Sequence, residues 1–318
     1  MDIKFEILNQ LIEADGQDVS GEKLRGDFGI TRAAVWKHIN ALRELGWDIA
    51  AVPRRGYRLE HLPDLLHPAC IAPFRRTEGF SAPIQHFFSC DSTNLLLKRM
   101  ANEGAPHGSA VFAEEQTAGR GRLGRVWQSE AGGLYMSVLL RPDMMPYDAQ
   151  TITLLAALAV LYAIGEETPL RPELKWPNDV LLNDKKVCGI LTEMSGTIEK
   201  VDWIVIGIGI NVGQLQFPSE IQDTATSIAQ CTPQCPPRAL LAASILDMLF
   251  ILYNHWMENG AADIIERILP YCSTIGKQVN YTKGREQLTG IATGIDARGR
   301  LIIDDSEYVF SGEVTVKK

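Results

Sequence analysis

The sequence has few cysteines, no long apolar run and no excess of basic residues. Its six cysteines are scattered through 318 residues, whereas a disulfide framework is typical of small secreted domains, so we expect reduced thiols. The longest uninterrupted apolar stretch, Leu154–Ile164, is well short of the ~20 residues that a membrane span requires. The first six residues do not resemble a secretory signal. These absences favour a soluble, cytoplasmic protein.

The sequence also shows no clear motif for metal binding or for a catalytic nucleophile. The six histidines show no ligand spacing, and the pair Cys231 and Cys235 has no matching second pair, so we expect no metal site. No G-x-S-x-G elbow, the motif that exposes a serine nucleophile, stands out.

The charge balance limits which partners the protein can bind. Acidic residues outnumber basic ones by 39 to 31, which gives a formal net charge of −8. This balance excludes a protein that is coated all over with nucleic acid or that binds anionic lipid broadly, so any contact with DNA must be local. The length, with 46% hydrophobic residues, is enough for two or three domains.

Residues 1–62 have the pattern of a winged helix-turn-helix. Apolar residues recur at helical spacing from Phe5, Ser20 caps a second helix, and Gly29 turns the chain into a third helix that begins at Thr31. Two strands, Asp48–Val52 and Tyr57–Leu59, then flank a tight basic turn. The predicted buried stripe of the third helix is Val35, Ile39 and Leu42.

A local basic patch within this unit is suited to DNA phosphates. From Arg32 to Arg58 there are six basic residues against two acidic ones, and they belong to the third helix and the wing. The alternative is a small helical packing domain with ordinary solvated arginines. The predicted DNA-binding residues are Arg32, Ala33, Trp36, Lys37, Asn40, Arg54 and Arg55.

A proline-containing loop follows the winged unit, and we interpret it as a linker. Residues 63–270 contain both predicted strands and predicted helices, whereas residues 271–318 contain predicted strands alone. The first range predicts an α/β domain, and the second, with short alternating strands between glycine turns, predicts a small β-barrel. The predicted strands of the α/β domain are Ala110–Gln116, Leu134–Leu140 and Trp203–Ile210. Its predicted helices are Asn94–Met100, Thr151–Ile164 and Arg238–Trp256.

The segment Gly119–Arg125 reads Gly-Arg-Gly-Arg-Leu-Gly-Arg and satisfies G-x-G-x-x-G. We reject a dinucleotide fold, because that fingerprint must open a helix, whereas a strand-like run follows here. What remains is a glycine loop with three guanidinium groups, which is suited to a nucleotide phosphate. A solvated basic turn is the alternative.

Three further segments could contact a ligand. Asp91–Asn94 places two hydroxyls and an amide at a helix N-terminus, where they could hold a polar ligand or simply cap the helix. Lys175–Asp179 precedes a hairpin in which Lys185 and Lys186 must face opposite ways. One of the two lysines could therefore neutralise the charge of a phosphate. The alternative is a solvated charged turn. In Ile206–Asn211, alternate glycines flatten one face for a ring-shaped ligand or for a tight inter-strand contact.

Taken in this order, the winged unit, the glycine-arginine loop, the Lys-Trp-Pro-Asn-Asp run and the small β-domain resemble the bifunctional biotin-protein ligases that are also biotin operon repressors. The resemblance covers essentially the whole chain. It implies a biotin/lipoate ligase-like catalytic domain and an SH3-like C-terminal barrel. It also implies ATP-dependent formation of biotinyl-5′-AMP, transfer of biotin to a lysine of the biotin carboxyl carrier protein of acetyl-CoA carboxylase, and a ligand-promoted homodimer that binds operator DNA with the adenylate as corepressor.

The resemblance also assigns roles to residues of this chain. The catalytic residues would be Lys186, Arg122 and Asp179. The biotin-binding residues would be Ser92, Thr93, Asn94, Gln116, Arg120, Gly121, Arg122, Lys186 and Gly189. The adenylate-binding residues would be Arg120, Arg122, Trp127 and Asn211.

One residue departs from the family pattern, and two other functions remain possible. The family loop often has an arginine where this chain has Leu123, which puts in doubt any contact of that guanidinium, for example between subunits.

Two anions must meet when a carboxylate attacks ATP, so Mg²⁺ is expected besides the basic side chains. The alternatives are a transcription factor that senses biotin or its adenylate without catalysis, and a lipoate-protein ligase.

Overall fold

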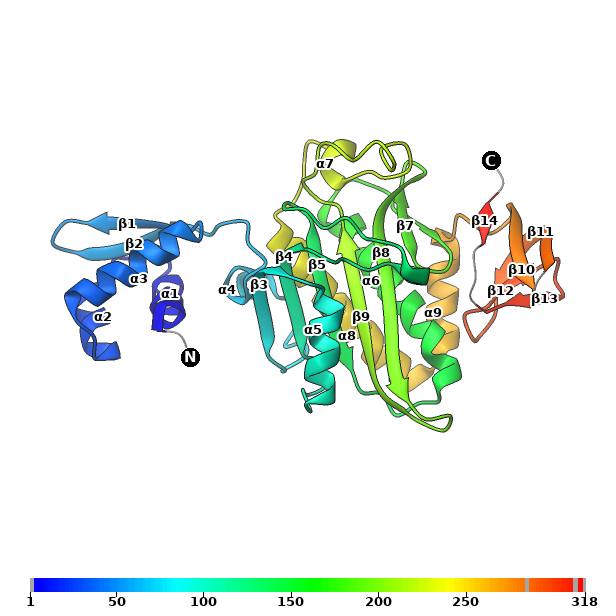
Figure 1. Ribbon diagram of the computed structural model, residues 1–318, viewed down its shortest axis with the longest axis horizontal. Helices are drawn as coiled ribbons and strands as arrows, with labels where there is room; N and C mark the ends of the chain where they lie inside the picture. Colours follow the sequence, from blue (N-terminus) through cyan, green and yellow to red (C-terminus); the bar gives the residue numbers. More distant parts are fainter. Residues whose placement is uncertain (1–2, 284–285, 311–313, 317–318) are drawn as a thin grey trace. The chain divides into compact units, whose positions relative to one another are not determined.

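The computed structural model of the chain describes residues 3–283, 286–310 and 314–316. The chain divides into two compact units, residues 1–65 and 66–318. The first unit is small and mostly helical, and the second is built on a seven-stranded sheet (Figure 1).

The N-terminal unit confirms the predicted helix-turn-helix with its hairpin. Ser20 Oγ accepts a hydrogen bond from the Lys23 backbone N–H, and Thr31 Oγ1 accepts one from Ala34, so both helix starts are capped as expected. Gly29 adopts the left-handed conformation that ends the second helix, with φ of 63°. The predicted stripe Val35, Ile39 and Leu42 is buried. The elements are α1 (Ile3–Glu13), α2 (Gly21–Phe28), α3 (Arg32–Glu44), β1 (Asp48–Val52) and β2 (Gly56–His61).

The β1–β2 hairpin, the predicted wing, is tied to the loop before α2. Val19 and Tyr57 exchange backbone hydrogen bonds of 2.8 and 2.9 Å. Gly56 lies so close to that loop that a Cβ atom would stand 2.1 Å from Val19 O, and its φ is +120°. Only glycine fits there without strain, so the turn end of the wing, where Gly56 pairs with Val52, has a fixed position within its unit.

The second unit contains a mixed sheet in the order β3-β4-β5-β9-β8-β7-β6. Only β3 and β4 run parallel, and the other neighbours are antiparallel. The predicted bounds of β4 and β5 are confirmed, whereas β3 was not predicted. The strands are β3 (Ile84–Cys90), β4 (Ala110–Gln116), β5 (Leu134–Leu140), β6 (Glu173–Lys175), β7 (Asp179–Leu182), β8 (Lys185–Gly196) and β9 (Val201–Ile210).

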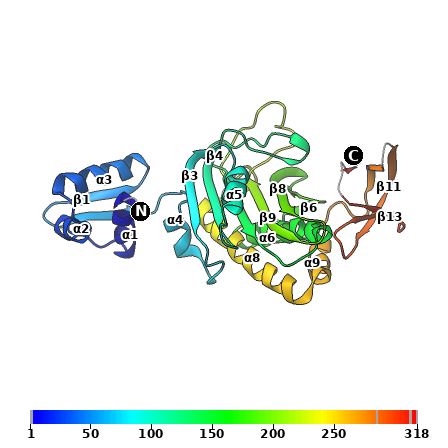
Figure 2. The same cartoon turned by 60° about the horizontal axis from the view of Figure 1, so that its bottom comes forward.

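Helices cover both faces of this sheet (Figure 2). On β8, Thr192 hydrogen-bonds Thr153 of α6, and the next residue, Glu193, bonds Lys98 of α5. Because adjacent strand residues point to opposite faces, α5 and α6 lie on opposite sides. The α8 helix is long and apolar enough for a membrane span, but most of it is buried in the fold beside α6. The helices are α5 (Thr93–Asn102), α6 (Ala149–Glu167), α7 (Ile228–Cys231), α8 (Arg238–Asn259) and α9 (Ala261–Ile268).

The expected proline-rich linker is partly helical. Pro68 begins the short helix α4 (Pro68–Ile71), a 3₁₀ turn (Ala72–Phe74) follows, and His67 Nδ1 accepts a hydrogen bond from Ala69. Proline is tolerated in the first helical turn because its missing N–H has no intrahelical partner there. Pro68 therefore starts a helix here rather than maintaining an extended loop.

The C-terminal residues form a five-stranded antiparallel sheet, which confirms the predicted β-domain. Trp176, just after β6, connects this sheet to the larger one. Its Nε1 donates to Gly299 O and its backbone N–H donates to Thr274 Oγ1, both at 3.0 Å. The strands are β10 (Gln278–Lys283), β11 (Glu286–Ile295), β12 (Leu301–Ile303), β13 (Glu307–Val309) and β14 (Thr315–Val316).

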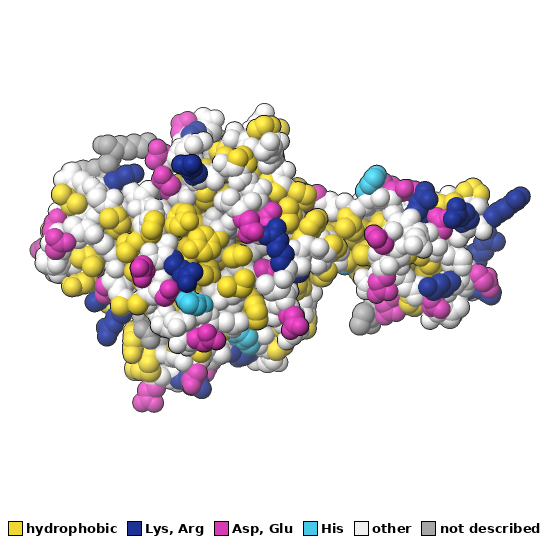
Figure 3. Space-filling model, turned by 180° about the vertical axis from the view of Figure 1, so that it is seen from behind, with side chains coloured by type: hydrophobic (Ala, Val, Ile, Leu, Met, Phe, Trp, Pro, Cys, Tyr) yellow, Lys and Arg dark blue, Asp and Glu magenta, His cyan; other side chains and the backbone are white. Residues whose placement is uncertain are grey.

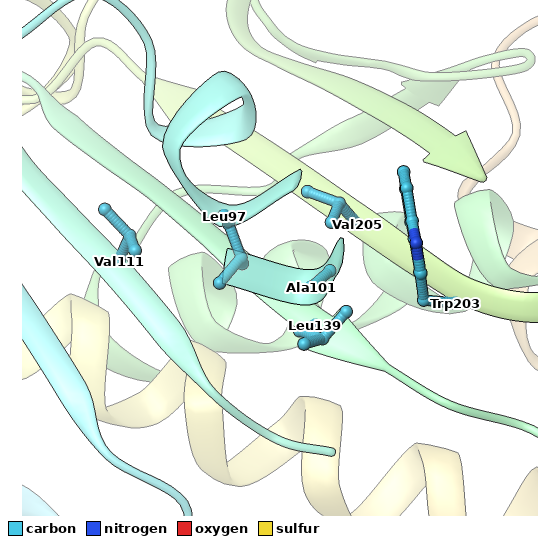
Figure 4. Close-up of a cluster of buried hydrophobic side chains, with 6 residues drawn as sticks. All are labelled: Leu97, Ala101, Val111, Leu139, Trp203 and Val205. Carbon is cyan, nitrogen blue, oxygen red and sulfur yellow. The ribbon is translucent and has the colours of Figure 1, made fainter. Parts of the chain in front are cut away.

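A cluster of buried apolar side chains fixes α5 on the sheet (Figure 4). Leu97 is fully buried and lies among side chains from three strands. The other members of the cluster are Ala101, Val111, Leu139, Trp203 and Val205. This packing sets the position of the polar N-terminus of α5.

Leu97→Ala should destabilise the second unit by about 2–5 kcal/mol, because it removes transfer energy and leaves a cavity. Native-state hydrogen exchange of the β5 amides measures this free energy. Met257→Ala on the exposed side of α8, where the side chain is 46% exposed, is the control and should change it by less than about 0.5 kcal/mol. Equal effects of the two substitutions would contradict the packing described.

Candidate functional site

A cavity of about 250 Å³ lies over the centre of the seven-stranded sheet. The loop Gly119–Arg125, the N-terminus of α5 and the β7–β8 hairpin all contribute to its lining. The predicted catalytic and ligand-binding residues that line it are Ser92, Thr93, Asn94, Gln116, Arg120, Gly121, Arg122, Trp127, Asp179, Lys186 and Gly189. The glycine-arginine loop and Lys186, which the resemblance assigned to one set of biotin-binding residues, therefore line the same cavity.

The glycine-arginine loop is a closed hairpin-like turn. Trp127 N donates to Gly119 O at 3.0 Å, and Gly121 N donates to Arg125 O at 2.8 Å. Residues 122–124 form only a 3₁₀ turn, in which Leu123 has a φ of 55°. No α-helix begins in this loop, all of which the structure describes, so the rejection of a dinucleotide fold is confirmed.

Arg122 turns inward and is held by the Lys-Trp-Pro-Asn-Asp run. Its Nη1 donates to Asn178 Oδ1 at 2.7 Å, and Asn178 Nδ2 donates to Ile190 O. Burial lowers the pKa of Arg122, the charge of Asp179 raises it, and the like charge of Arg125 lowers it. A guanidinium remains protonated in proteins despite such a shift, so the cavity contains a fixed positive charge.

Lys186 is the lysine of the hairpin that enters the cavity. Its Nζ lies 2.6 Å from Asp179 Oδ1, whereas Lys185 Nζ donates to Gln222 O at 3.3 Å, outside the lining. The expectation that adjacent lysines face opposite ways is confirmed. Arg122 and Lys186 therefore bring two positive charges to the cavity, where Asp179 is the one acidic residue of its described lining.

Glycines in β8 and β9 make room for side chains above the sheet. A Cβ atom at Gly209 would lie 2.4 Å from Trp127 Nε1, and one at Gly189 would lie 2.9 Å from the Trp127 ring. A Cβ atom at Gly207 would lie 2.1 Å from Asn94 Oδ1. The flat face predicted from Gly207 and Gly209 is present, and Trp127 and Asn94 lie on it.

The N-terminus of α5 forms the polar end of the cavity. Thr93 N donates to Gln116 Oε1 at 2.9 Å, and Gln116 Nε2 donates to Ser129 Oγ at 2.8 Å. Ser92 is the N-cap residue but its side chain makes no capping hydrogen bond in this described segment. The interpretation of Ser92 as a simple cap is therefore not supported, and the residue lines the cavity.

Asn211 is the predicted ligand-binding residue that the structure does not bring into the cavity lining. It follows β9, is buried, and its Nδ2 donates to Thr226 O at 3.0 Å. Its role in adenine recognition stays a prediction.

Residues that the sequence analysis did not assign hold the predicted ones in place. Asn178 contacts Arg122, and Ser137 and Glu193 contact Asn94. Asn178 was quoted as part of a motif but without a role. Ser137 and Glu193 lie 43 and 99 residues along the chain from Asn94, so no local signal pointed to them.

Most of the predicted DNA-binding residues are exposed on the N-terminal unit. Trp36 has 59% of its surface exposed, and such exposure is unusual for a tryptophan on a helix. Asn40 is the exception, because it is half-buried and accepts a hydrogen bond from Arg43. The exposed members are Arg32, Ala33, Trp36, Lys37, Arg54 and Arg55.

The basic patch is less positive than the count of residues suggested. Arg55 and Arg58 both pair with Asp18, at 2.6 and 3.6 Å, and Arg58 also pairs with Glu60. These two acids lie outside the stretch that was counted. Basic and acidic side chains are intermixed on the face of this unit in Figure 3. Arg54 makes no ion pair in the described residues.

The structure describes all six cysteines. The six cysteines are free thiols. The described residues include no group of three or more His, Cys, Asp or Glu side chains that could hold a metal ion.

Comparison with known proteins gives consistent matches along the chain. Residues 87–211 match the Biotin/lipoate A/B protein ligase family, residues 4–58 match the HTH domain, and residues 274–316 match the Biotin protein ligase C terminal domain. The chain is 37% identical over 310 residues to the Bifunctional ligase/repressor BirA of Bacillus subtilis (strain 168), which covers 96% of this chain and 95% of that protein.

Two further similarities agree with this match. The Bifunctional ligase/repressor BirA of Escherichia coli (strain K12) is 31% identical over 308 residues, covering 96% of this chain and 94% of that protein. Among solved structures, the biotin protein ligase from Aquifex aeolicus in complex with biotin and ATP has a TM-score of 0.65 and 31% identity, covering 74% of this chain and 98% of that one.

Proposed function

Because the chain belongs to the family of bifunctional biotin ligase/repressor proteins, we propose that it is a biotin--[biotin carboxyl-carrier protein] ligase and a biotin-responsive repressor. The observation that carries the enzymatic part is the meeting of Arg122 and Lys186 at a cavity whose other end is lined by Ser92, Thr93 and Gln116. One end is suited to phosphate and carboxylate, and the other to a polar ring.

In the first reaction, an oxygen of the biotin carboxylate forms a bond to the α-phosphorus of ATP. The bond between that phosphorus and the bridging oxygen to the β-phosphate breaks, so pyrophosphate leaves and biotinyl-5′-AMP remains. Two anions must approach each other, and Lys186, Arg120 and Arg122 offset their repulsion. Because Asn178 already holds Arg122, and Asp179 holds Lys186, little reorganisation is needed.

In the second reaction, the amine of a carrier lysine attacks the carbonyl carbon of the adenylate. A carbon–nitrogen bond forms, AMP leaves, and the amine loses a proton. Asp179 is the proposed acceptor, since it is the one carboxylate in the described lining of the cavity. The loop Gly119–Arg125 covers the reactive anhydride and excludes water from it.

The nucleotide is proposed to lie toward Trp127 and Asn211. The Trp127 ring lies on the glycine face, and its Nε1 is buried without a hydrogen-bond partner in the described residues. Asn211 Nδ2 is bonded to Thr226 O, which leaves Oδ1 for the amino group of adenine. Asp179, the one carboxylate of the described lining, is the side chain that could hold Mg²⁺, which would offset the negative charge of the ATP phosphates.

A transfer assay with labelled biotin, ATP and an apo carrier domain tests the enzymatic proposal. Label should become covalently attached to the carrier lysine. A protein that forms the adenylate or binds biotin but transfers nothing would be a sensor instead. A protein whose adenylate formation prefers lipoate over biotin would be a lipoate-protein ligase.

Lys186→Met should lower the rate of adenylate formation by about two orders of magnitude or more, because it removes a preorganised positive charge worth about 3 kcal/mol at the transition state. Biotin-dependent exchange between ATP and labelled pyrophosphate measures this rate. Lys185→Met is the matched control, since its ammonium is directed to Gln222 O, and it should keep the wild-type rate. A near-wild-type rate in Lys186→Met would remove the proposed role.

The repressor part rests on the N-terminal unit. We propose three domains, with DNA binding by residues 1–62, catalysis by residues 63–270 and a β-domain of residues 271–318. The adenylate-bound protein forms a homodimer in the cytoplasm, so two winged units read two half-sites of an operator. Ligand occupancy and DNA affinity are then linked through differential binding.

Replacing Arg54 and Arg55 together with alanine should weaken DNA binding and flatten its salt dependence. Each lost phosphate contact lowers the slope of log K against log salt by about 0.9 per wing. Arg55 already pairs with Asp18, so we expect Arg54 to contribute more of this change. Titration of duplex DNA at several salt concentrations, with biotin and ATP present, measures the slope. Arg25→Ala on α2 is the control, and carrier biotinylation should be unchanged in both variants.

A further inference from the structure

The amide of Asn94 is held in one orientation by protein groups. Asn94 is almost completely buried and lines the cavity. Its Nδ2 donates to Leu191 O at 3.2 Å and to Glu193 Oε2 at 3.0 Å. Both amide hydrogens are therefore used within the protein, and only Oδ1 is available to a ligand.

Glu193 determines this orientation. A carboxylate has no hydrogen to donate, and the Leu191 carbonyl has none either, so a flipped amide would bring its oxygen against two acceptors. Ser137 Oγ, 2.6 Å from Asn94 Oδ1, does not choose between the orientations, because a hydroxyl both donates and accepts. Of the three contacts, the one with Glu193 carries a full charge and costs most to reverse.

Lys98 holds Glu193 in turn. Its Nζ lies 2.7 Å from Glu193 Oε1, so the two carboxylate oxygens have separate partners. Burial raises the pKa of Glu193. Hydrogen bonds from Lys98 and Asn94 and the charges of Lys98 and Arg120 lower it by more, so the pKa is below its usual value. Glu193 is therefore ionised near neutral pH and remains an acceptor.

The position of Gly207 shows where Asn94 Oδ1 lies. A Cβ atom at Gly207 would stand 2.1 Å from this oxygen, and Gly207 itself lines the cavity. The oxygen therefore lies over the floor of the cavity. A carbonyl oxygen has two lone pairs, so Oδ1 can accept from a ligand N–H besides the Ser137 hydroxyl.

We propose that Glu193, held by Lys98, is a positioning residue that fixes Asn94 as a hydrogen-bond acceptor and thereby selects ligands whose ring donates N–H groups, such as the ureido ring of biotin. The inference rests on the proposed function and names a determinant of its substrate specificity. A site that must accept from a ring N–H rejects ligands without it, because its own polar group is then left unpaired.

The first test is Glu193→Gln, whose side chain has a similar size but can present either a donor or an acceptor to Asn94. The KM for biotin should rise roughly tenfold, as expected for the loss of a charge-assisted hydrogen bond. The kcat of adenylate formation and the KM for ATP should stay within about twofold, because Glu193 does not touch the reacting atoms. Glu199→Gln, in the turn after β8, is the control and should behave as wild type.

The second test reverses the polarity of the pair. Asn94→Asp alone places an acceptor against Glu193 and should weaken biotin binding more than tenfold. In the double variant Asn94→Asp with Glu193→Gln, the glutamine amide can donate to the new carboxylate, and the total charge is that of wild type. Binding should recover at least threefold relative to Asn94→Asp, though incompletely, because Leu191 O still faces an acceptor.

Titration calorimetry with biotin reads these variants directly. Equal biotin affinity in wild type and Glu193→Gln would overturn the inference while leaving the proposed function intact. Failure of the double variant to recover binding would also overturn it, because a merely structural role predicts that the two losses add. A wild-type protein that binds no biotin would overturn both the proposed function and this inference.

Discussion

The cavity exists because two neighbouring strands place glycine opposite glycine. Gly189 of β8 pairs with Gly209 of β9, and the same row across the sheet continues to Asp179 on β7 and Tyr135 on β5. A side chain at either glycine would occupy the space that Trp127 now uses. The antiparallel register therefore does two things at once. It opens a flat floor, and it places the acidic partner of Lys186 at the rim of that floor.

Local patterns in the sequence were sufficient for much of the fold. The strands Ala110–Gln116 and Leu134–Leu140 are apolar runs with clear ends, and the helix caps at Ser20 and Thr31 are specified by single side chains. The opposite facing of Lys185 and Lys186 follows from the strand period alone. By contrast, β3 was not predicted, because its polar residues do not alternate with apolar ones in a regular way.

The parts of the site that could not be predicted depend on contacts between distant segments. Glu193 lies 99 residues from Asn94, and Asn178 lies 56 residues from Arg122. Asp18, which neutralises part of the wing, precedes the basic stretch and is joined to it only by folding. The motifs predicted residues that line the cavity. The residues that hold them in position come from the tertiary structure, so their identity cannot be inferred from local spacing.

The attachment of Trp176 has a consequence for the modularity of the chain. Its indole and its backbone N–H are satisfied by Gly299 O and Thr274 Oγ1, and two residues later Asn178 holds Arg122. The terminal sheet thus helps to support the part of the cavity where Arg122 lies, although it contributes little of the lining. Such a module cannot be exchanged between relatives as an independent piece. A replacement must bring a carbonyl and a hydroxyl to the same two points, or a buried indole N–H is left without an acceptor next to residues that line the cavity.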